Sequence, residues 1–161
     1  MLDFHDIYSS YAPDVYRFAY WLSGSIADAE DIASETFIRA WVRSDQIRTE
    51  TLKGYLLQIA RNIYLQNLRR KWRQVKLEDI YADPRPGPDQ LAGDRADLAT
   101  AQRILQTLPE KDRAAFILRV QQELHYDEIA RILGISLGAV KVKIYRARKK
   151  MLTARLNEEA K

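Results

Sequence analysis

The residues whose chemistry is easiest to interpret are basic and lie near the end of the sequence. Seven Lys and Arg side chains and no acids fall between Leu137 and Asn157. At about 100° per residue, a helix here turns one set of side chains away from its apolar stripe. That set is Lys141, Val142, Tyr145, Arg146 and Lys149, with Lys143, Arg148 and Lys150 on its flanks. Arg and Lys donate to guanine O6 and N7, apolar groups contact the thymine methyl, and flanking bases neutralise phosphates. This face is therefore predicted to bind duplex DNA.

The residues before this basic helix have the spacing of a helix-turn-helix. Ile129, Ala130 and Leu133 form the predicted inner face of a short helix over residues 126–133. Gly134 supplies the backbone freedom for a tight turn, and Ser136, also a candidate DNA contact, can cap the helix that follows. The alternative is a solvated basic helix packed on its neighbours. The turn, the cap and the one-sided charge together favour DNA binding.

A second basic and aromatic segment lies in the first half of the chain. Apolar spacing predicts a helix from Leu52 to about Trp72 that ends in a basic run. Rings can stack on unpaired bases while guanidinium groups follow phosphates, so this helix could hold a single strand. Its candidate contacts are Tyr55, Arg61, Asn62, Gln66, Arg69 and Arg70. The alternative is that its aromatic residues belong to the core, and composition alone leaves both interpretations open.

An acidic segment precedes that helix. Four acids and no bases fall between Ser23 and Ile38, on a helix that Ser25 can cap. Acids in a first turn stabilise the helix dipole, which is one explanation; the other is that Asp28, Asp31 and Glu35 dock a basic protein surface. A metal site is not expected, because all three acids lie along one helix with no second supplier of ligands.

Composition excludes several classes of function. The chain has 161 residues, a formal charge of +4 and no Cys, so disulfides, thiolate nucleophiles and zinc-thiolate sites are ruled out. Its two His residues are far apart, and no glycine-rich phosphate loop or nucleophile elbow is present. We therefore expect neither an enzyme nor a cofactor. No signal peptide or membrane span is evident, so we expect a cytoplasmic protein without membrane insertion.

Apolar residues recur at spacings of three and four almost throughout, which predicts an all-α fold. One stripe ends at Leu22, before Ser23 and Gly24, and the stripe of the acidic helix ends at Ala40 and Trp41. In the second half, Pro109 is expected to open a helix whose apolar side includes Val120.

The expected helices fall into two small domains. Residues 75–94 contain three Pro, two Gly and five acids, without a helical apolar period. This segment is predicted to be a flexible acidic linker between domains at 1–74 and 95–161, and it is long enough for the domains to move independently.

These segments together resemble the extracytoplasmic-function (group 4) sigma factors, the small sigma-70-type subunits of bacterial RNA polymerase. The segment AEDIASETFIRAW at 29–41 resembles the family's polymerase-binding helix, and YLLQIARNIYLQNLRRKWR at 55–73 resembles its promoter-melting helix. Residues 108–152 resemble its helix-turn-helix domain. The order of the segments and the position of the linker also match.

The resemblance implies partners and roles for the candidate residues. Asp28, Asp31, Glu35 and Ile38 would face the clamp helices of the largest subunit of the polymerase core. Asn62, together with the loop before Leu52, would receive a base flipped from the minus-ten element of promoter DNA. The outer face of the last helix would contact the minus-thirty-five element. An anti-sigma factor is a further expected partner. The alternative class is a stand-alone helix-turn-helix regulator, which would dimerise on symmetric half-sites.

Overall fold

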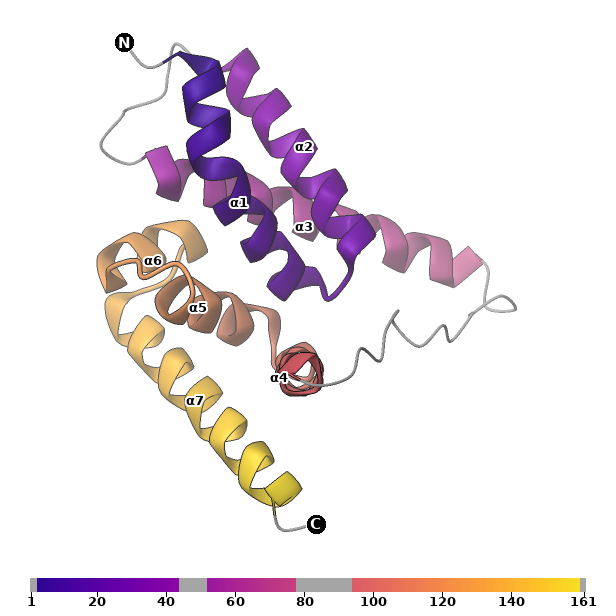
Figure 1. The fold of residues 1–161 in the computed structure, drawn as a ribbon, viewed down its shortest axis with the longest axis vertical. Coiled ribbons are helices and arrows are strands. Elements are labelled where there is room, and N and C mark those ends of the chain that lie inside the picture. The colour runs from indigo at the N-terminus through magenta and orange to yellow at the C-terminus, as the bar shows by residue number, and fades with distance from the viewer. Residues whose placement is uncertain (1–2, 44–51, 78–93, 160–161) are drawn as a thin grey trace.

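The computed structural model describes residues 3–43, 52–77 and 94–159, and every regular element within these ranges is an α-helix, which confirms the predicted all-α class. Two groups of helices are evident (Figure 1). The N-lobe is α1 (Phe4–Ser23), α2 (Ile26–Val42) and α3 (Leu52–Leu77). The C-lobe is α4 (Asp94–Gln106), α5 (Glu110–Val120), α6 (Tyr126–Leu133) and α7 (Leu137–Glu159).

The N-lobe is a bundle in which α1 and α2 pack against each other and on α3. Its core includes Phe18, Ile32 and Leu56, all of them buried. The predicted helix ends are confirmed: Gly24 ends α1 in the left-handed region at φ 76°, and the Ser25 hydroxyl accepts a hydrogen bond from the Asp28 amide at 3.2 Å. These two caps set the sharp turn that lays α2 back against α1.

Trp41 and Val120, which the sequence placed on apolar stripes, are exposed. Trp41 is 58% exposed and lies in the last turn of α2. Its ring stands edge to face against Phe4 at the start of α1, with centroids 4.5 Å apart. Val120, the last residue of α5, is also exposed. Pro109 stands just before α5 as its N-cap residue rather than opening the helix.

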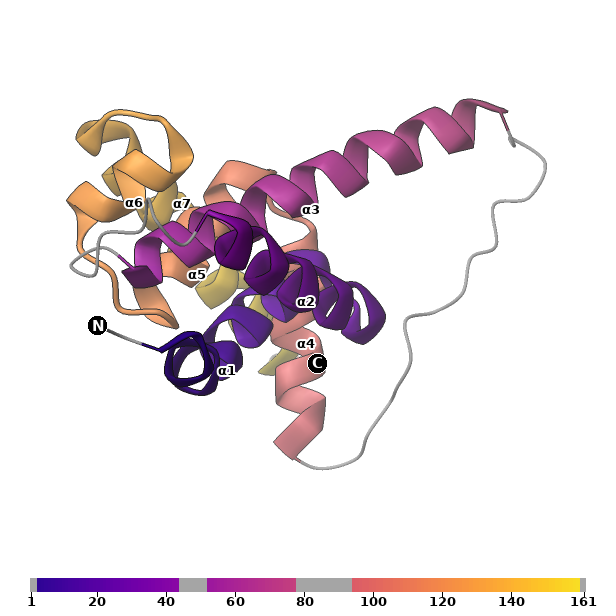
Figure 2. The same ribbon diagram turned by 90° about the horizontal axis from the view of Figure 1, so that it is seen from above.

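The predicted linker is shorter at both ends than its composition indicated. Helix α3 continues five residues beyond Trp72 to Leu77, and α4 already begins at Asp94. The last turns of α3 extend away from the other helices (Figure 2). They do not pack on a core, so the sequence there has no apolar stripe from which the continuing helix could be predicted. The segment between, residues 78–93, lies outside the described residues, and its flexibility stays a prediction.

The two lobes lie against each other in the structure, with α1 contacting α4 and α5, and α3 contacting α6. The Gln122 side-chain amide donates to the Asp14 carbonyl at 3.1 Å, and the Lys53 ammonium donates to the Gln122 carbonyl at 3.1 Å. Arg61 of α3 forms an ion pair with Glu110 of α5 at 2.7 Å. Independent movement of the lobes would require these contacts to break.

Candidate nucleic-acid interface

The helix-turn-helix expected from the sequence is present in α6 and α7. Gly134 ends α6 in the left-handed region at φ 65°, and the Ile135 amide donates back to the Ala130 carbonyl at 3.1 Å. The Ser136 hydroxyl accepts from the Ala139 amide at 3.1 Å, which caps the start of α7 as predicted. Ile129 of α6 and Val140 of α7 are buried, and the two helices pack against each other, so the direction of α7 is fixed by packing as well as by the turn.

The outer face of α7, by which we mean Lys141, Val142, Tyr145, Arg146 and Lys149, is exposed as a set. Tyr145 is 66% exposed, and Val142 is also open to solvent. Exposed apolar groups among bases fit a base-contacting surface better than a merely soluble helix face. Of the other candidates, Ser136, Arg148 and Lys150 are exposed, whereas Lys143 is largely covered.

Two of these bases share an acid that sequence reasoning missed. The Asp112 carboxylate lies 3.3 Å from an Arg146 terminal nitrogen and 3.4 Å from the Lys143 ammonium. Asp112 stands in the first turn of α5, so 31 and 34 residues separate it from its partners. Helical periodicity connects only residues three or four apart, and it therefore carried no signal for this cluster.

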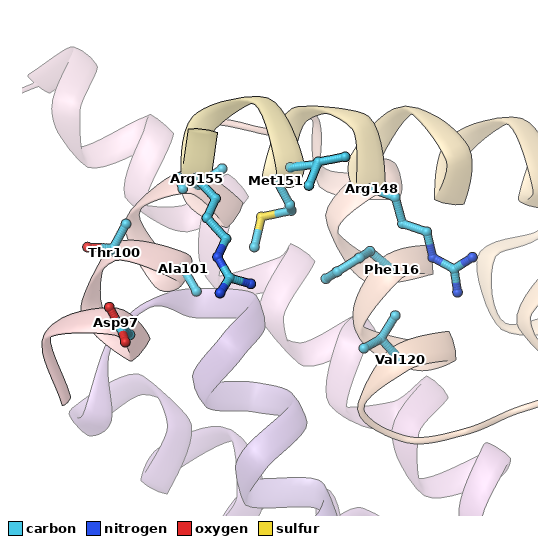
Figure 3. A pocket seen from close by; sticks show the side chains of 10 residues that line it. Asp97, Thr100, Ala101, Phe116, Val120, Arg148, Met151 and Arg155 are labelled. Carbon is cyan, nitrogen blue, oxygen red and sulfur yellow. The ribbon is translucent and has the colours of Figure 1, made fainter. Parts of the chain in front are cut away.

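A hollow of about 880 Å³ lies between α4, α5 and the basic helix α7 (Figure 3). Phe116, Val120 and Met151 give it an apolar lining, and Arg148 stands at its edge. Arg148 therefore lies on the flank of α7 between the hollow and the outer face, as the helical projection predicted.

The candidates on α3 do not share one environment. Asn62, Gln66, Arg69 and Arg70 are exposed, and Tyr55 is half-buried beside α6. Gln66 accepts a hydrogen bond from Arg39 of α2 at 3.0 Å. Arg61 differs most, because its side chain is only 7% exposed and donates to both Glu110 carboxylate oxygens, at 2.7 and 2.9 Å. In this arrangement Arg61 faces the C-lobe and is not presented to a strand.

Tyr64, one of the aromatic residues on α3, belongs to the boundary between the lobes. Its hydroxyl accepts a hydrogen bond from Arg113 of α5 at 2.9 Å. Burial raises the pKa of the Tyr64 hydroxyl above its ordinary value, an effect that the Arg113 guanidinium partly offsets. For Tyr64 the core interpretation of the aromatic residues is the better one, because this ring is buried.

The acidic candidates on α2 are also unequal. Asp31 and Ile38 are exposed and have room for a partner. Glu35 pairs with Arg39 at 2.6 Å yet keeps 45% of its side chain exposed, and Asp28 pairs with Lys71 of α3 at 2.8 Å. Within residues 3–43, 52–77 and 94–159, no group of three His, Cys, Asp or Glu side chains could hold a metal ion. No helix in these ranges is long and apolar enough to cross a membrane.

Comparison with known proteins assigns both lobes to one class. Residues 7–74 match the family model of sigma-70 region 2, and residues 98–151 match the model of sigma-70 region 4. The chain thus has the two conserved parts of a sigma-70-type factor, in the same order. The first match covers α1–α3 almost completely, and the second ends within the basic helix α7.

Individual relatives show to which group of sigma-70-type factors the chain is similar. The chain is 32% identical over 159 residues to SigW of Bacillus subtilis, covering 90% of this chain and 84% of SigW. It is 35% identical to SigE of Mycolicibacterium smegmatis, of which it spans 61%. Both are named as extracytoplasmic-function RNA polymerase sigma factors. A solved complex of the sigma factor RpoE with the anti-sigma factor NepR, from Bartonella quintana, contains a similar fold, with a TM-score of 0.82, 28% identity and coverage of 94% of this chain and 96% of that one.

The chain belongs to the extracytoplasmic-function family of RNA polymerase sigma factors. Members of this family act in transcription initiation, where RNA polymerase is directed to promoters, and they are not themselves the catalysts of RNA synthesis.

Proposed function

We propose that this chain binds the RNA polymerase core through α2 and directs it to promoters through two DNA contacts. The outer face of α7 recognises the minus-thirty-five element as duplex, and the exposed side of α3 around Asn62 holds the melted minus-ten strand. The observation that carries the proposal is the exposed outer face of α7 on a capped helix-turn-helix, within the segment that matches region 4. A basic helix face of this kind suits a major groove.

Strand capture gives the proposed mechanism its driving force. Unstacking and flipping a base costs a few kcal/mol, and a protein that binds only the open strand shifts the duplex toward opening by its differential affinity. Asn62, Arg69 and Arg70 are exposed and can make this contact. Arg61 can join them only when its pair with Glu110 is broken.

The polymerase contact is assigned to Asp31, Glu35 and Ile38. Asp31 and Ile38 are exposed and Glu35 keeps 45% of its side chain exposed, so α2 presents acids beside an apolar side chain, a combination suited to the clamp helices of the largest subunit. Both Asp28 and Glu35 are paired with a base, but Asp28 is the weaker candidate because its side chain is 32% exposed, against 45% for Glu35. An anti-sigma factor is proposed as a further partner, because the structurally similar RpoE is solved in complex with one.

Transcription in vitro tests the proposal. Purified core polymerase plus this chain is expected to initiate at a promoter selected from a random DNA pool, whereas core alone does not. A stand-alone helix-turn-helix regulator would instead bind DNA without co-purifying with the core. Such a function would also give no role to residues 7–74, which match sigma-70 region 2. Failure to initiate at any selected promoter would overturn the proposal.

Base recognition by α7 makes a separate prediction. Arg146→Ala or Lys141→Ala should weaken promoter binding by about 1 to 3 kcal/mol and relax specificity at particular base pairs. Lys150→Ala should instead weaken binding to all sequences and reduce the salt dependence by about one counterion. Binding of holoenzyme to single-base promoter variants at several salt concentrations measures both effects. Equal specificity profiles for the three variants would contradict the assignment.

A further inference from the structure

Asp112 is the one buried acid that contacts the proposed DNA surface within the described residues. Its side chain is 6% exposed, although it stands beside a helix whose outer face is open. A buried carboxylate requires partners, and Asp112 forms ion pairs with Lys143 and Arg146, both of them on α7. Helix α5 begins directly after its N-cap residue Pro109, and Asp112 lies in its first turn, so the position of the carboxylate depends on the backbone of α5 rather than on a loop.

Arg146 is held by this carboxylate while it remains available to DNA. Its side chain is 55% exposed, and the contact to Asp112 is through one terminal nitrogen at 3.3 Å. A guanidinium has five N–H donors in a rigid fork, so one contact restricts the fork without using it up. Bidentate recognition of guanine requires an oriented guanidinium, and a side chain that is already ordered loses less entropy on binding.

Lys143 completes the cluster and accounts for its charge. Its ammonium contacts the same Asp112 oxygen as Arg146, and it lies three residues before Arg146 on the same helix. One carboxylate between two cations leaves a net charge of one, so Asp112 lowers the attraction of this surface for any phosphate backbone. The cluster thus restricts non-specific attraction while it orders the base-contacting group.

We propose that Asp112 is a positioning residue that holds Arg146 for base recognition and thereby sets specificity at one base pair of the promoter. The proposal rests on the proposed function, in which α7 contacts the minus-thirty-five element. Asp112 itself is not assigned a contact with DNA.

The test compares Asp112→Asn with the unchanged chain, each as holoenzyme, on the selected promoter, on its single-base variants and on unrelated duplex. Asn keeps the shape and removes the charge. Discrimination at the base pair that depends on Arg146 should fall by about 10-fold, within the range of one bidentate contact. Affinity for unrelated duplex should rise, with the salt dependence increasing by about one counterion. A structural defect would instead lower affinity for every sequence.

Asp127→Asn is the matched control, because it removes an exposed acid from the same lobe, in the first turn of α6. It should leave discrimination unchanged. In an Arg146→Ala background, Asp112→Asn should cause no further loss at the same base pair, since the group that it positions is gone. Additive losses in the double variant would overturn the proposal, as would unchanged discrimination in Asp112→Asn.

A second measurement needs no substitution. NMR relaxation of the arginine Nε–H groups in the free chain should show Arg146 more ordered than the exposed Arg148 two residues away. Equal mobility would overturn the positioning role even if Asp112→Asn failed to fold. The two levels of proposal are distinguishable: if Arg146→Ala leaves specificity unchanged, base recognition by Arg146 fails, whereas relaxed specificity in Arg146→Ala but not in Asp112→Asn rejects only the role of Asp112.

Discussion

Arg61→Met is expected to open the contact between the lobes in the free chain. The substitution leaves the Glu110 carboxylate, whose side chain is only 18% exposed, without its partner. Breaking a buried pair from one side costs about 3 kcal/mol or more if the surroundings stay closed. The lobes can avoid that cost by separating, which returns Glu110 to water. Small-angle scattering should therefore show a larger radius of gyration than for the unchanged chain.

Two further variants make this result specific. Arg61→Met combined with Glu110→Leu should restore the closed form, because replacing both members of a buried pair with apolar side chains is often neutral or stabilising. Arg17→Met removes an exposed pair with Asp14 and should change nothing measurable. An unchanged radius of gyration in Arg61→Met would show that this ion pair does not hold the lobes together. A larger radius of gyration in the double variant would show the same.

The Arg61 pair also connects the closed form to the proposed function. Arg61 is one of the side chains predicted to contact the minus-ten strand, and in the closed form it is paired with Glu110 of α5. Arg61 cannot donate to Glu110 and follow a phosphate with the same nitrogens at once. Capture of the strand by Arg61 therefore requires the lobes to separate first, whereas Asn62 and Gln66 are exposed in either case.

The second large effect is expected for Ile129→Ala. Ile129 of α6 is fully buried, so truncation of its side chain should lower the free energy of unfolding of the C-lobe by about 2 to 5 kcal/mol. That loss is large for a domain of this size, so binding to the minus-thirty-five duplex should be lost. Core polymerase should still bind, because α2 lies in the other lobe. Denaturant unfolding and co-purification with the core measure the two results.

Val142→Ala is the control for Ile129→Ala. Val142 is an exposed aliphatic residue on α7, so its truncation should change the stability by no more than about 0.5 kcal/mol. Any effect on DNA binding then comes from the surface and not from unfolding. Loss of core binding together with duplex binding in Ile129→Ala would contradict the assignment of the two contacts to separate lobes.

Local signals made much of the fold predictable. The turn and caps around Gly134 and Ser136 placed α6 at residues 126–133 and the start of α7 correctly, because a left-handed glycine and a side-chain cap depend on neighbours in the sequence. The end of α3 was placed five residues too early, since its last turns have no apolar stripe. The exposure of Trp41 depends on how the end of α2 packs against the rest of the fold, and the spacing of apolar residues does not encode this packing.

The candidate sites were predictable in their residues but not in all of their contacts. The outer face of α7 followed from helical geometry alone, and its exposure agrees with that projection. The burial of Arg61 and the cluster at Asp112 depend on partners 49 and 34 residues away. Such pairs form only when whole helices pack, and one sequence contains no sign of which distant charges will meet.

Photo-crosslinking within the open promoter complex tests the central claim most directly. A crosslinkable residue is placed at Tyr145 on α7 and, in a second chain, at Asn62 on α3, both of which are exposed. We expect position 145 to crosslink to paired DNA at the minus-thirty-five element, and position 62 to an unpaired base at the minus-ten element that permanganate oxidation marks as melted. Crosslinks from position 145 to the polymerase instead of DNA, or from position 62 to duplex alone, would contradict the account.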